Sequence, residues 1–371
     1  MSNEQRQVHQ ALADAVILIP SLEPDERLPD YIRKLTEAGF GHVVVVDDGS
    51  GEKYQPIFRE IEAVDTRVTV LHHDVNHGKG VALKTGYRWI QEHLPGVSGV
   101  ITADADGQHT VSDCTRLAEE LEKGQRALYL GTRDFSQKNV PPKSRTGNRL
   151  TSVLFLLLYG KWLQDTQTGL RAFRREDLGF MIDVEGDRFE YEMNVLIACA
   201  RTNLPMIQIP IETVYENENK GTHYHPLKDS MRIFRVIIRG FVRFMGASLI
   251  CFLVDHGIFN LLNLGIFRNG QANILSFVVL ATAIARVISA TLNFLLNRTF
   301  VFQLKGESRG AVWRYAALSV GILLASAGCV WLLGQAGMSS TVAKIIVDTL
   351  LYFVSFQAQQ KWVFRETREG K

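Results

Sequence analysis

The chain has 371 residues, enough for two or three domains, and 46% of them are hydrophobic. Its 41 basic and 39 acidic residues leave a formal net charge of +2, which says little about partners, and no nucleic-acid partner is predicted. Four cysteines without metal-site or disulfide spacing are typical of a reducing compartment, and the N-terminus does not have the pattern of a cleavable signal peptide. Up to about residue 225 the sequence is typical of a soluble protein, whereas after about residue 240 it is apolar in long blocks.

Short β-rich runs alternate with helical patterns in the N-terminal half. The expected strands are 15–20, 42–48, 67–73, 99–106 and 127–133, and the expected helices are 25–38, 52–63, 78–94 and 112–123. This order predicts an α/β fold with a parallel sheet covered by helices. Ligands of such sheets bind at the carboxyl ends of the strands, so the residues at those ends are the candidates for chemistry.

Two aspartates one residue apart, Asp104 and Asp106, end the fourth expected strand. Alternate residues of a strand share a face, so both carboxylates are expected to point at one spot. A hard divalent cation, Mg²⁺ or Mn²⁺, would neutralise them and would also bind phosphate oxygens. The alternative is an Asp-rich turn whose side chains cap backbone N–H groups.

A second acidic pair, Asp47 and Asp48, follows a run of four valines. A carboxylate here is suited to a ribose or a base, although Ser50 can also cap a helix at the same place. The stretch NHGKGVALKTG (76–86) lacks the spacing of a P-loop. Its glycines would let the backbone approach a phosphate, and Lys79 would supply charge.

Five motifs, taken together and in order, resemble the family 2 glycosyltransferases with a GT-A (Rossmann-like) nucleotide-sugar-binding fold. The motifs are DDGS (47–50), NHGKGVAL (76–83), DADGQH (104–109), GTR (131–133) and DTQTGLR (165–171), and the resemblance covers about residues 14–235. The sequence looks most like the polyprenyl-phosphate sugar synthases of the dolichol-phosphate mannose synthase type. One motif departs from the family: the first strand ends Pro-Ser-Leu-Glu-Pro (20–24), where the family often has Pro-Thr-Tyr-Asn-Glu.

The resemblance implies an inverting, metal-dependent transferase that uses a UDP- or GDP-linked sugar and an undecaprenyl or dolichyl phosphate. It implies a metal held by Asp104, Asp106 and Gln108, and a donor contacted by Pro20, Glu23, Asp47, Asp48 and Lys79. An anionic acceptor needs cations more than a general base, and about half of the available ones are expected to touch substrate: Arg133, Lys143, Arg145, Arg149, Arg171 and Lys220. Asp165 and the run Phe-Glu-Tyr-Glu (189–192) are candidates for organising the acceptor or the sugar.

The last third predicts an all-α transmembrane domain of four helices. The apolar blocks are about 244–266, 273–296, 312–333 and 342–360, each long enough to span a bilayer. Basic residues gather after the second and fourth blocks, which predicts that the catalytic domain and both termini are cytoplasmic, at the inner (cytoplasmic) membrane. Three charged residues lie inside the blocks: Asp255, Arg286 and Asp348.

An internal repeat is expected in this domain. FLLNRTFVF (294–302) matches FQAQQKWVF (356–364), and RFMGASL (243–249) matches RYAALSV (314–320). Two duplicated hairpins would explain the pattern, and chance similarity of apolar segments is the alternative. Over about residues 238–365 the pattern also resembles the GtrA family, which is associated with moving or handling polyprenyl-linked sugars. The predicted domains are therefore 1–225 (GT-A), 226–243 (a juxtamembrane interface helix) and 244–371 (GtrA-like), and homo-oligomerisation through the last of these remains open.

The joint between the domains carries a basic stripe. Lys228, Arg232, Arg235, Arg239 and Arg243 recur every three or four residues, which is the pattern of a helix lying on an anionic leaflet. The apolar run 153–160 is too short to span a membrane and is either core or an interfacial segment. Two other functions stay open: transfer to another lipid or a polysaccharide, and lipid-sugar transport with a domain that only binds nucleotide.

Overall fold

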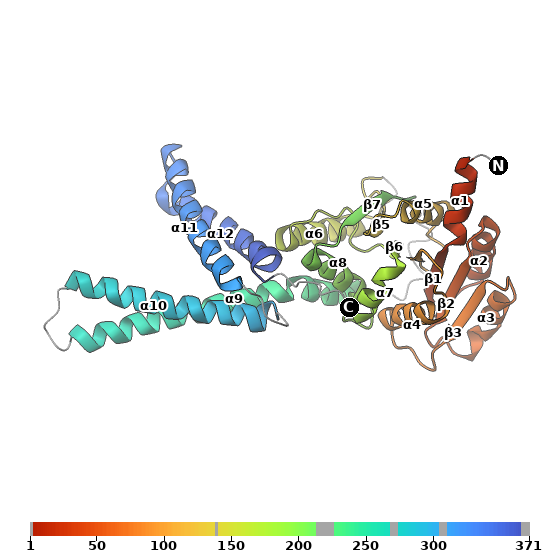
Figure 1. Cartoon of the computed structure of the whole chain (residues 1–371), viewed down its shortest axis with the longest axis horizontal. Coiled ribbons are helices and arrows are strands. Elements are labelled where there is room, and N and C mark those ends of the chain that lie inside the picture. Colours follow the sequence, from red (N-terminus) through yellow and green to blue (C-terminus); the bar gives the residue numbers. More distant parts are fainter. Residues whose placement is uncertain (1–2, 138–139, 213–225, 268–273, 304–309, 365–371) are drawn as a thin grey trace. The chain divides into compact units, whose positions relative to one another are not determined.

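The computed structural model describes residues 3–137, 140–212, 226–267, 274–303 and 310–364 (Figure 1). The chain divides into two compact units, Met1–Val236 and Ile237–Lys371. Each unit has its own architecture, which positions a different set of polar residues.

The first unit is built on a seven-stranded sheet in the order β3-β2-β1-β4-β6-β5-β7. The strands are β1 (Ala15–Ser21), β2 (His42–Asp47), β3 (Val68–His72), β4 (Gly99–Thr102), β5 (Leu128–Thr132), β6 (Arg171–Arg174) and β7 (Met206–Pro210). β6 runs antiparallel to both β4 and β5, and the other pairs are parallel. The α/β prediction is confirmed, and the five strands expected from sequence run parallel to one another. β6 and β7 were not foreseen, and the antiparallel β6 makes the sheet mixed instead of purely parallel.

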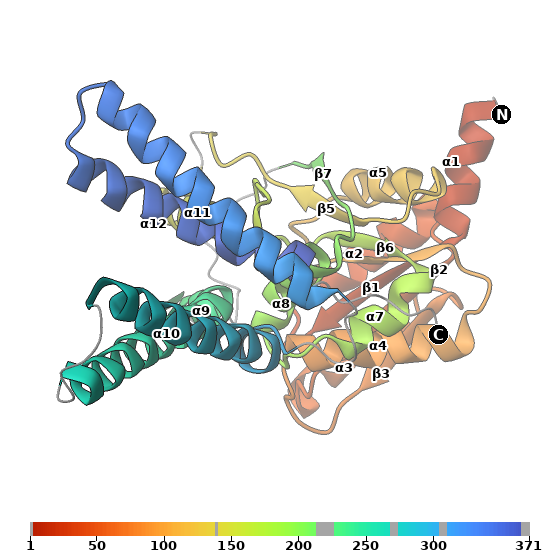
Figure 2. The same ribbon diagram turned by 60° about the vertical axis from the view of Figure 1, so that its left-hand side comes forward.

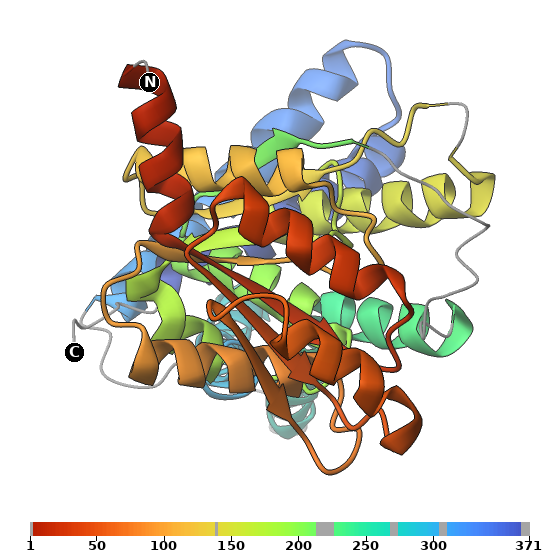
Figure 3. The same ribbon diagram turned by 90° about the vertical axis from the view of Figure 1, so that its right-hand side faces the viewer.

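Helices cover both faces of this sheet, as Figure 3 shows. The helices of the first unit are α1 (Asn3–Ala13), α2 (Arg27–Ala38), η1 (Glu52–Tyr54), α3 (Gln55–Glu62), α4 (Lys79–His93), α5 (Val111–Glu122), α6 (Pro142–Tyr159), η2 (Arg175–Asp177), α7 (Leu178–Asp183) and α8 (Glu190–Thr202). In β1, Ile17 and Ile19 pack with the apolar side chains of α2 and α5. Leu18 points to the other face, where a Cβ on Gly86 of α4 would lie 2.2 Å from its Cδ1. Burial on both faces explains why the central strands are continuously apolar.

The apolar run 153–160 falls in the last half of α6. Phe155, Leu158 and Tyr159 are buried, whereas Leu156 and Leu157 are about two-fifths exposed. The run therefore contributes to the core through Phe155, Leu158 and Tyr159, while Leu156 and Leu157 stay partly exposed.

The second unit holds long apolar helices. They are α9 (Pro226–Phe267), which begins in the first unit, α10 (Ile274–Leu296), α11 (Ala311–Gln335) and α12 (Ser340–Ala358). Four segments are long and apolar enough to cross a membrane: Met231–Leu262, Val278–Val301, Ala311–Gln335 and Ser340–Val363. Among the described residues, the four expected helices that are long and apolar enough to span a membrane are thus present. The segment 226–243 is continuous with the first of them in α9, and the candidate span begins within it, at Met231.

The second unit also bears out the internal repeat. α9 pairs with α10, and α11 with α12, as two antiparallel hairpins (Figure 2). Each hairpin ends in a five-residue π-helix, η4 (Asn297–Val301) and η5 (Gln359–Val363), at matching positions of the repeat. The ring contacts are matched as well: Phe294 lies 5.5 Å from Phe364, and Phe356 lies 5.8 Å from Phe302. Asn297 donates across the repeat to the Gln359 Oε1 at 2.9 Å.

Candidate active site

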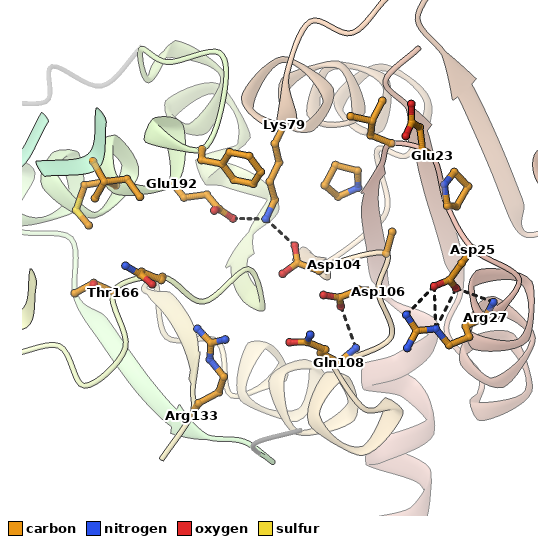
Figure 4. A pocket seen from close by; sticks show the side chains of 18 of the residues that line it. Glu23, Asp25, Arg27, Lys79, Asp104, Asp106, Gln108, Arg133, Thr166 and Glu192 are labelled. Carbon is orange, nitrogen blue, oxygen red and sulfur yellow. Dashed lines mark hydrogen bonds and ion pairs between the residues drawn. The ribbon is translucent and has the colours of Figure 1, made fainter. Parts of the chain in front are cut away.

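A cavity of about 580 Å³ in the first unit lies beyond the carboxyl ends of β1 and β4. Seven of the residues predicted from sequence line it: Pro20, Glu23, Lys79, Asp104, Asp106, Gln108 and Arg133 (Figure 4). The sequence analysis assigned no role to several other lining residues, namely Arg27, Tyr54, Thr166, Gln167, Met193 and Ile233. Phe189 and Glu192, from the acidic run at the start of α8, line it too.

Asp104 and Asp106 lie in the loop after β4, which ends at Thr102. The sequence analysis had expected the alternation of a strand to bring the two carboxylates together, but the loop does so instead. Asp106 turns back on this loop, where its Oδ1 accepts a hydrogen bond from the Gln108 backbone N–H at 3.0 Å. Thr102 Oγ1 donates to the Gly169 carbonyl oxygen at 2.7 Å, which brings the DTQTGLR segment against Asp104. A Cβ on Gly169 would lie 2.3 Å from Asp104 Oδ2, so this close approach requires glycine.

Lys79 is clamped between two carboxylates. Its Nζ lies 2.6 Å from Asp104 Oδ1 and 2.9 Å from Glu192 Oε1, as Figure 4 shows. The other Asp104 oxygen, Oδ2, faces His109 Nε2 at 3.2 Å. The Lys79 ammonium also lies 5.9 Å from the centre of the Phe189 ring. Gly78 precedes it with φ of +103°, and a Cβ there would lie 2.5 Å from Arg188 Cγ, so glycine is needed to start α4 here.

The charges of the cluster are strongly coupled. Burial would raise the pKa of Asp104, but Lys79 and His109 hold it well below its usual range. Burial, together with the neighbouring Asp104 charge, raises the pKa of Asp106. Burial would lower the pKa of Lys79, but Asp104 and Glu192 raise it above its ordinary value. Three carboxylates against one ammonium leave an excess of negative charge in the cavity.

This donor set fits a hard divalent cation. Mg²⁺ in nucleotide sites is usually held by one or two carboxylates together with substrate phosphates, and two carboxylates are what Asp104 and Asp106 offer. Within the described residues, no group of three or more His, Cys, Asp or Glu side chains is arranged to hold a metal without further ligands. The site is therefore suited to a metal that is also coordinated by a diphosphate. The side chain of Gln108 lines the same cavity.

Asp47 and Asp48 do not line the cavity. Asp47 accepts hydrogen bonds from the Ser50 N–H at 2.8 Å and from Gln55 Nε2 at 3.1 Å, and such hydrogen bonds outweigh burial and lower its pKa. Asp48 accepts from the N–H groups of His77 and Gly78, at 3.0 and 2.7 Å. Both acids thus shape the loops that border the site, and Asp48 fixes the turn that presents Lys79.

The first-strand motif reaches the cavity rim. The Glu23 backbone has φ of +49°, and its N–H donates to Ser50 Oγ at 2.8 Å. Nearby, Arg27 pairs with Asp25 at 2.7 Å, and both line the cavity together with Tyr54. The cavity lining thus includes an aromatic ring, a guanidinium and the ring of Pro20.

The predicted acceptor cations separate in the structure. Of the four whose side chains are described, Arg133 alone lines the cavity, where its Nε lies 2.7 Å from the buried Asp165 Oδ2. Arg171 is buried and donates to the carbonyl oxygens of Thr168 and Glu192, at 2.9 and 2.7 Å. Arg145 is exposed and donates to the Phe135 and Gln137 carbonyl oxygens, and Arg149 is exposed on α6. The Lys143 side chain and Lys220 lie outside the described residues.

Two family models match the chain. Residues 17–180 match glycosyl transferase family 2, and residues 243–364 match the GtrA/DPMS transmembrane domain. The chain joins a family 2 glycosyl transferase domain to a GtrA/DPMS transmembrane domain. Both resemblances stated from the motifs are confirmed, the enzyme is a glycosyltransferase, and the apolar helices make it a multi-pass membrane protein.

Several proteins that are similar in sequence or structure to this chain have names that state an activity. A UDP-N-acetylglucosamine–dolichyl-phosphate N-acetylglucosaminyltransferase of Methanococcus voltae is 27% identical over 222 residues, covering 55% of this chain and 88% of the relative. A polyprenol monophosphomannose synthase of Mycolicibacterium smegmatis is 26% identical over 204 residues, covering 53% and 76%. Among solved structures, glucosyl-3-phosphoglycerate synthase of Mycobacterium tuberculosis, in complex with Mn²⁺ and UDP, superposes with a TM-score of 0.48 at 15% identity, covering 62% of this chain and 82% of that one.

Proposed function

We propose that this glycosyltransferase moves a sugar from a UDP- or GDP-linked donor to a polyprenyl phosphate, undecaprenyl or dolichyl, with inversion and with Mg²⁺ or Mn²⁺. The observation that carries the proposal is the sorting of charge in one cavity, where Asp104 and Asp106 lie with Lys79 and Arg133. Carboxylates suit a metal diphosphate, and cations suit phosphate oxygens. The names of the two relatives, which specify dolichyl phosphate and a polyprenol, support a lipid-phosphate acceptor.

The donor would lie across the carboxyl ends of the strands. Pro20, Glu23 and Tyr54 would border the nucleoside, with Asp47 and Asp48 holding the loops behind it. Asp104, Asp106 and Gln108 would hold the cation on the diphosphate. When bound, the cation offsets the charge that develops on the leaving nucleoside diphosphate. Lys79, whose Nζ lies 2.6 Å from Asp104 Oδ1, would contact the same phosphate oxygens.

The acceptor would enter as an anion. A phosphate monoester is already negatively charged at neutral pH, so its oxygen can attack the anomeric carbon without a general base. The new bond joins that carbon to the acceptor oxygen while the bond to the diphosphate breaks, and one displacement inverts the configuration. Arg133, fixed by Asp165, would orient the acceptor, whereas Arg171 would act through the loop that it binds.

The membrane domain would hold the enzyme where its acceptor is. We place residues 1–225 and both termini in the cytoplasm, at the inner membrane, because basic residues gather on the loops of that side. The first part of α9, residues 226–243, would lie on the anionic leaflet, and Arg232, Arg235 and Arg239 are exposed there. Residues 244–371 would anchor the chain and handle the lipid-linked product.

A donor panel tests the proposal. Membranes that contain the full chain are incubated with radiolabelled UDP- and GDP-sugars plus undecaprenyl phosphate, and lipids are then extracted. We expect one donor to label the organic phase, and a membrane with Asp104→Asn to label it no more than background. Label that enters a polysaccharide or a neutral lipid instead would move the acceptor to another class, and the absence of transfer from every donor would contradict the proposal.

A further inference from the structure

The membrane domain contains two ionic clusters, one in each hairpin. In the first, Ser289 Oγ donates to Asp255 Oδ1 at 2.9 Å, and Arg286 Nη2 lies 3.5 Å from Asp255 Oδ2. In the second, Ser326 Oγ donates to Asp348 Oδ1 at 2.7 Å, and Lys344 Nζ lies 2.9 Å from Asp348 Oδ2. Each cluster thus combines a serine, an aspartate and a cation from two neighbouring helices.

The internal repeat relates the two clusters. Aligning 243–249 with 314–320 places Asp255 opposite Ser326, and aligning 294–302 with 356–364 places Arg286 opposite Asp348. The same level of each hairpin is therefore polar, but the residues that occupy it differ. Because the repeat relates the two hairpins, the second cluster can be compared directly with the first.

Lys344 and Arg286 differ in how many polar partners they contact and in how exposed they are. Lys344 is 56% exposed but contacts both Asp348 and Ser326, the latter at 2.9 Å, so its ammonium has two partners inside its own hairpin. Asp255 is 15% exposed and is already bound by Ser289, whereas the Arg286 side chain is 71% exposed and pairs with Asp255 through one 3.5 Å contact. The first cluster therefore presents most of a guanidinium outward.

The depth of Arg286 makes this exposure significant. Arg286 lies eight residues into the candidate membrane span Val278–Val301, which places it roughly 12 Å along that span at 1.5 Å per residue. A cation at that depth is costly in hydrocarbon, and such residues usually face a partner or an aqueous path. A guanidinium offers paired N–H donors that match two phosphate oxygens. Inside a bilayer, the phosphate best able to reach it is one carried on a lipid.

We propose that Arg286, oriented by Asp255 and Ser289, forms a second binding site, within the membrane domain, for the phosphate group of a polyprenyl-linked lipid. The site rests on the proposed function only in the choice of lipid. The ligand is the acceptor monophosphate or the glycosylated phosphodiester, which share the same anionic oxygens. Asp255 is a positioning residue here, because it holds the guanidinium from behind and is itself held by Ser289.

Photolabelling of the full chain in nanodiscs tests this site. The probe is a polyprenyl phosphate with a diazirine beside the phosphate, and labelled peptides are mapped by mass spectrometry. We expect label on α10, about tenfold less of it with Arg286→Gln, and an intermediate level with Arg286→Lys, as charge-assisted hydrogen bonds are lost. Lys344→Gln is the matched control and should leave the α10 label unchanged. Competition by unlabelled undecaprenyl phosphate or by its glycosylated diester tells which lipid binds more tightly.

Three outcomes would overturn the site. The first is equal labelling of α10 in the wild type and in a folded Arg286→Gln variant. The second is labelling by a neutral polyprenol probe that equals labelling by the phosphate probe. The third is a change of oligomeric state in Arg286→Gln, together with labelling that does not depend on the phosphate. The last outcome would assign Arg286 to a second copy of the chain. If Arg286→Gln fails to fold, the polyprenol comparison on the wild type still decides. An Asp104→Asn background, inactive in transfer, should keep the α10 label, which separates this site from the active site.

Discussion

The acidic cluster in the cavity of the transferase domain and the first ionic cluster of the membrane domain differ in their balance of charge. In the cavity, Asp104, Asp106 and Glu192 surround the single ammonium of Lys79. In the membrane domain, Arg286 stands largely exposed in front of one nearly buried carboxylate, Asp255. The first arrangement has an excess of negative charge, whereas the second is balanced in charge but leaves most of its guanidinium exposed. The two proposals assign a metal nucleotide to the first arrangement and a lipid phosphate to the second.

The largest expected effect comes from removing charge in the cavity. Asp104→Asn and Asp106→Asn should each lower transfer about 100-fold or more, because a metal contributes several kcal/mol of charge stabilisation. Transfer of radiolabelled sugar to extracted lipid measures this, with thermal melting to show that the chain is folded. Asp30→Asn, an exposed acid on α2 paired with Arg33, is the control and should be silent. Full activity of both variants in EDTA would remove the metal role.

A smaller effect is expected from replacing Lys79, whose ammonium would compete with a metal for Asp104. Lys79→Ala should lower transfer about 10- to 100-fold, as losses around metal ligands do, yet tighten Mn²⁺ binding to the donor-free protein. The reason is that the Lys79 ammonium lies 2.6 Å from Asp104 Oδ1, an oxygen that would also be a ligand of the proposed metal. Electron paramagnetic resonance of free Mn²⁺ measures the affinity. Lys123→Ala, at an exposed pair with Glu120, should change neither quantity, and unchanged Mn²⁺ affinity in Lys79→Ala would refute the competition.

The next smaller effect is expected from replacing the arginines that we propose to act on the acceptor. Arg133→Ala should raise the KM for lipid phosphate about tenfold, and more than the KM for the nucleotide sugar, because a charge-assisted contact is lost. Arg145→Ala and Arg149→Ala should act in the same direction but more weakly, since both side chains lie outside the cavity lining. Arg133→Ala also leaves Asp165 buried without its partner, so Arg133→Lys serves as the folded control. Equal changes in both KM values would assign Arg133 to the donor or to the fold.

The smallest expected effect is on stability. Gly169→Ala should lower the free energy of unfolding of the transferase domain by about 1–3 kcal/mol, because its Cβ would lie 2.3 Å from Asp104 Oδ2. Gly147→Ala, in α6 with no atom near the added Cβ, should instead be neutral or stabilise by up to about 1 kcal/mol. Urea titration of the full chain in detergent checks both. A Gly169→Ala variant as stable as wild type would show that the loop moves easily away from Asp104.

Motif residues at strand ends were predictable from sequence, and their hydrogen-bond partners were not. The placement of Asp104, Asp106 and Lys79 follows from the rule that ligands bind beyond the carboxyl ends of the strands. Asp47 and Arg171 stand in equally distinctive motifs, yet both are occupied by backbone groups of loops, which no local pattern reveals. β6 was missed because its four residues carry two arginines and its only signal was the tail of the DTQTGLR motif.

The cavity lining shows the same limit. Glu192 was singled out within an acidic run, but its pairing with Lys79 joins the first turn of α8 to that of α4 and depends on the fold. Arg27 and Tyr54 gave no signal, because a single arginine or tyrosine in a helical pattern is common. The repeat in the membrane domain was visible in sequence, whereas the paired π-helices were not expected from it.

The central claim is that metal-dependent transfer to a lipid phosphate takes place at Asp104 and Asp106. The most direct measurement strips membranes of metal with EDTA, restores Mn²⁺ or Mg²⁺, and compares undecaprenyl phosphate with undecaprenol as acceptors for the radiolabelled donor. The account predicts organic-phase label only when both the metal and the phosphate-bearing lipid are present. Label that persists in EDTA, or that forms equally on undecaprenol, would contradict it.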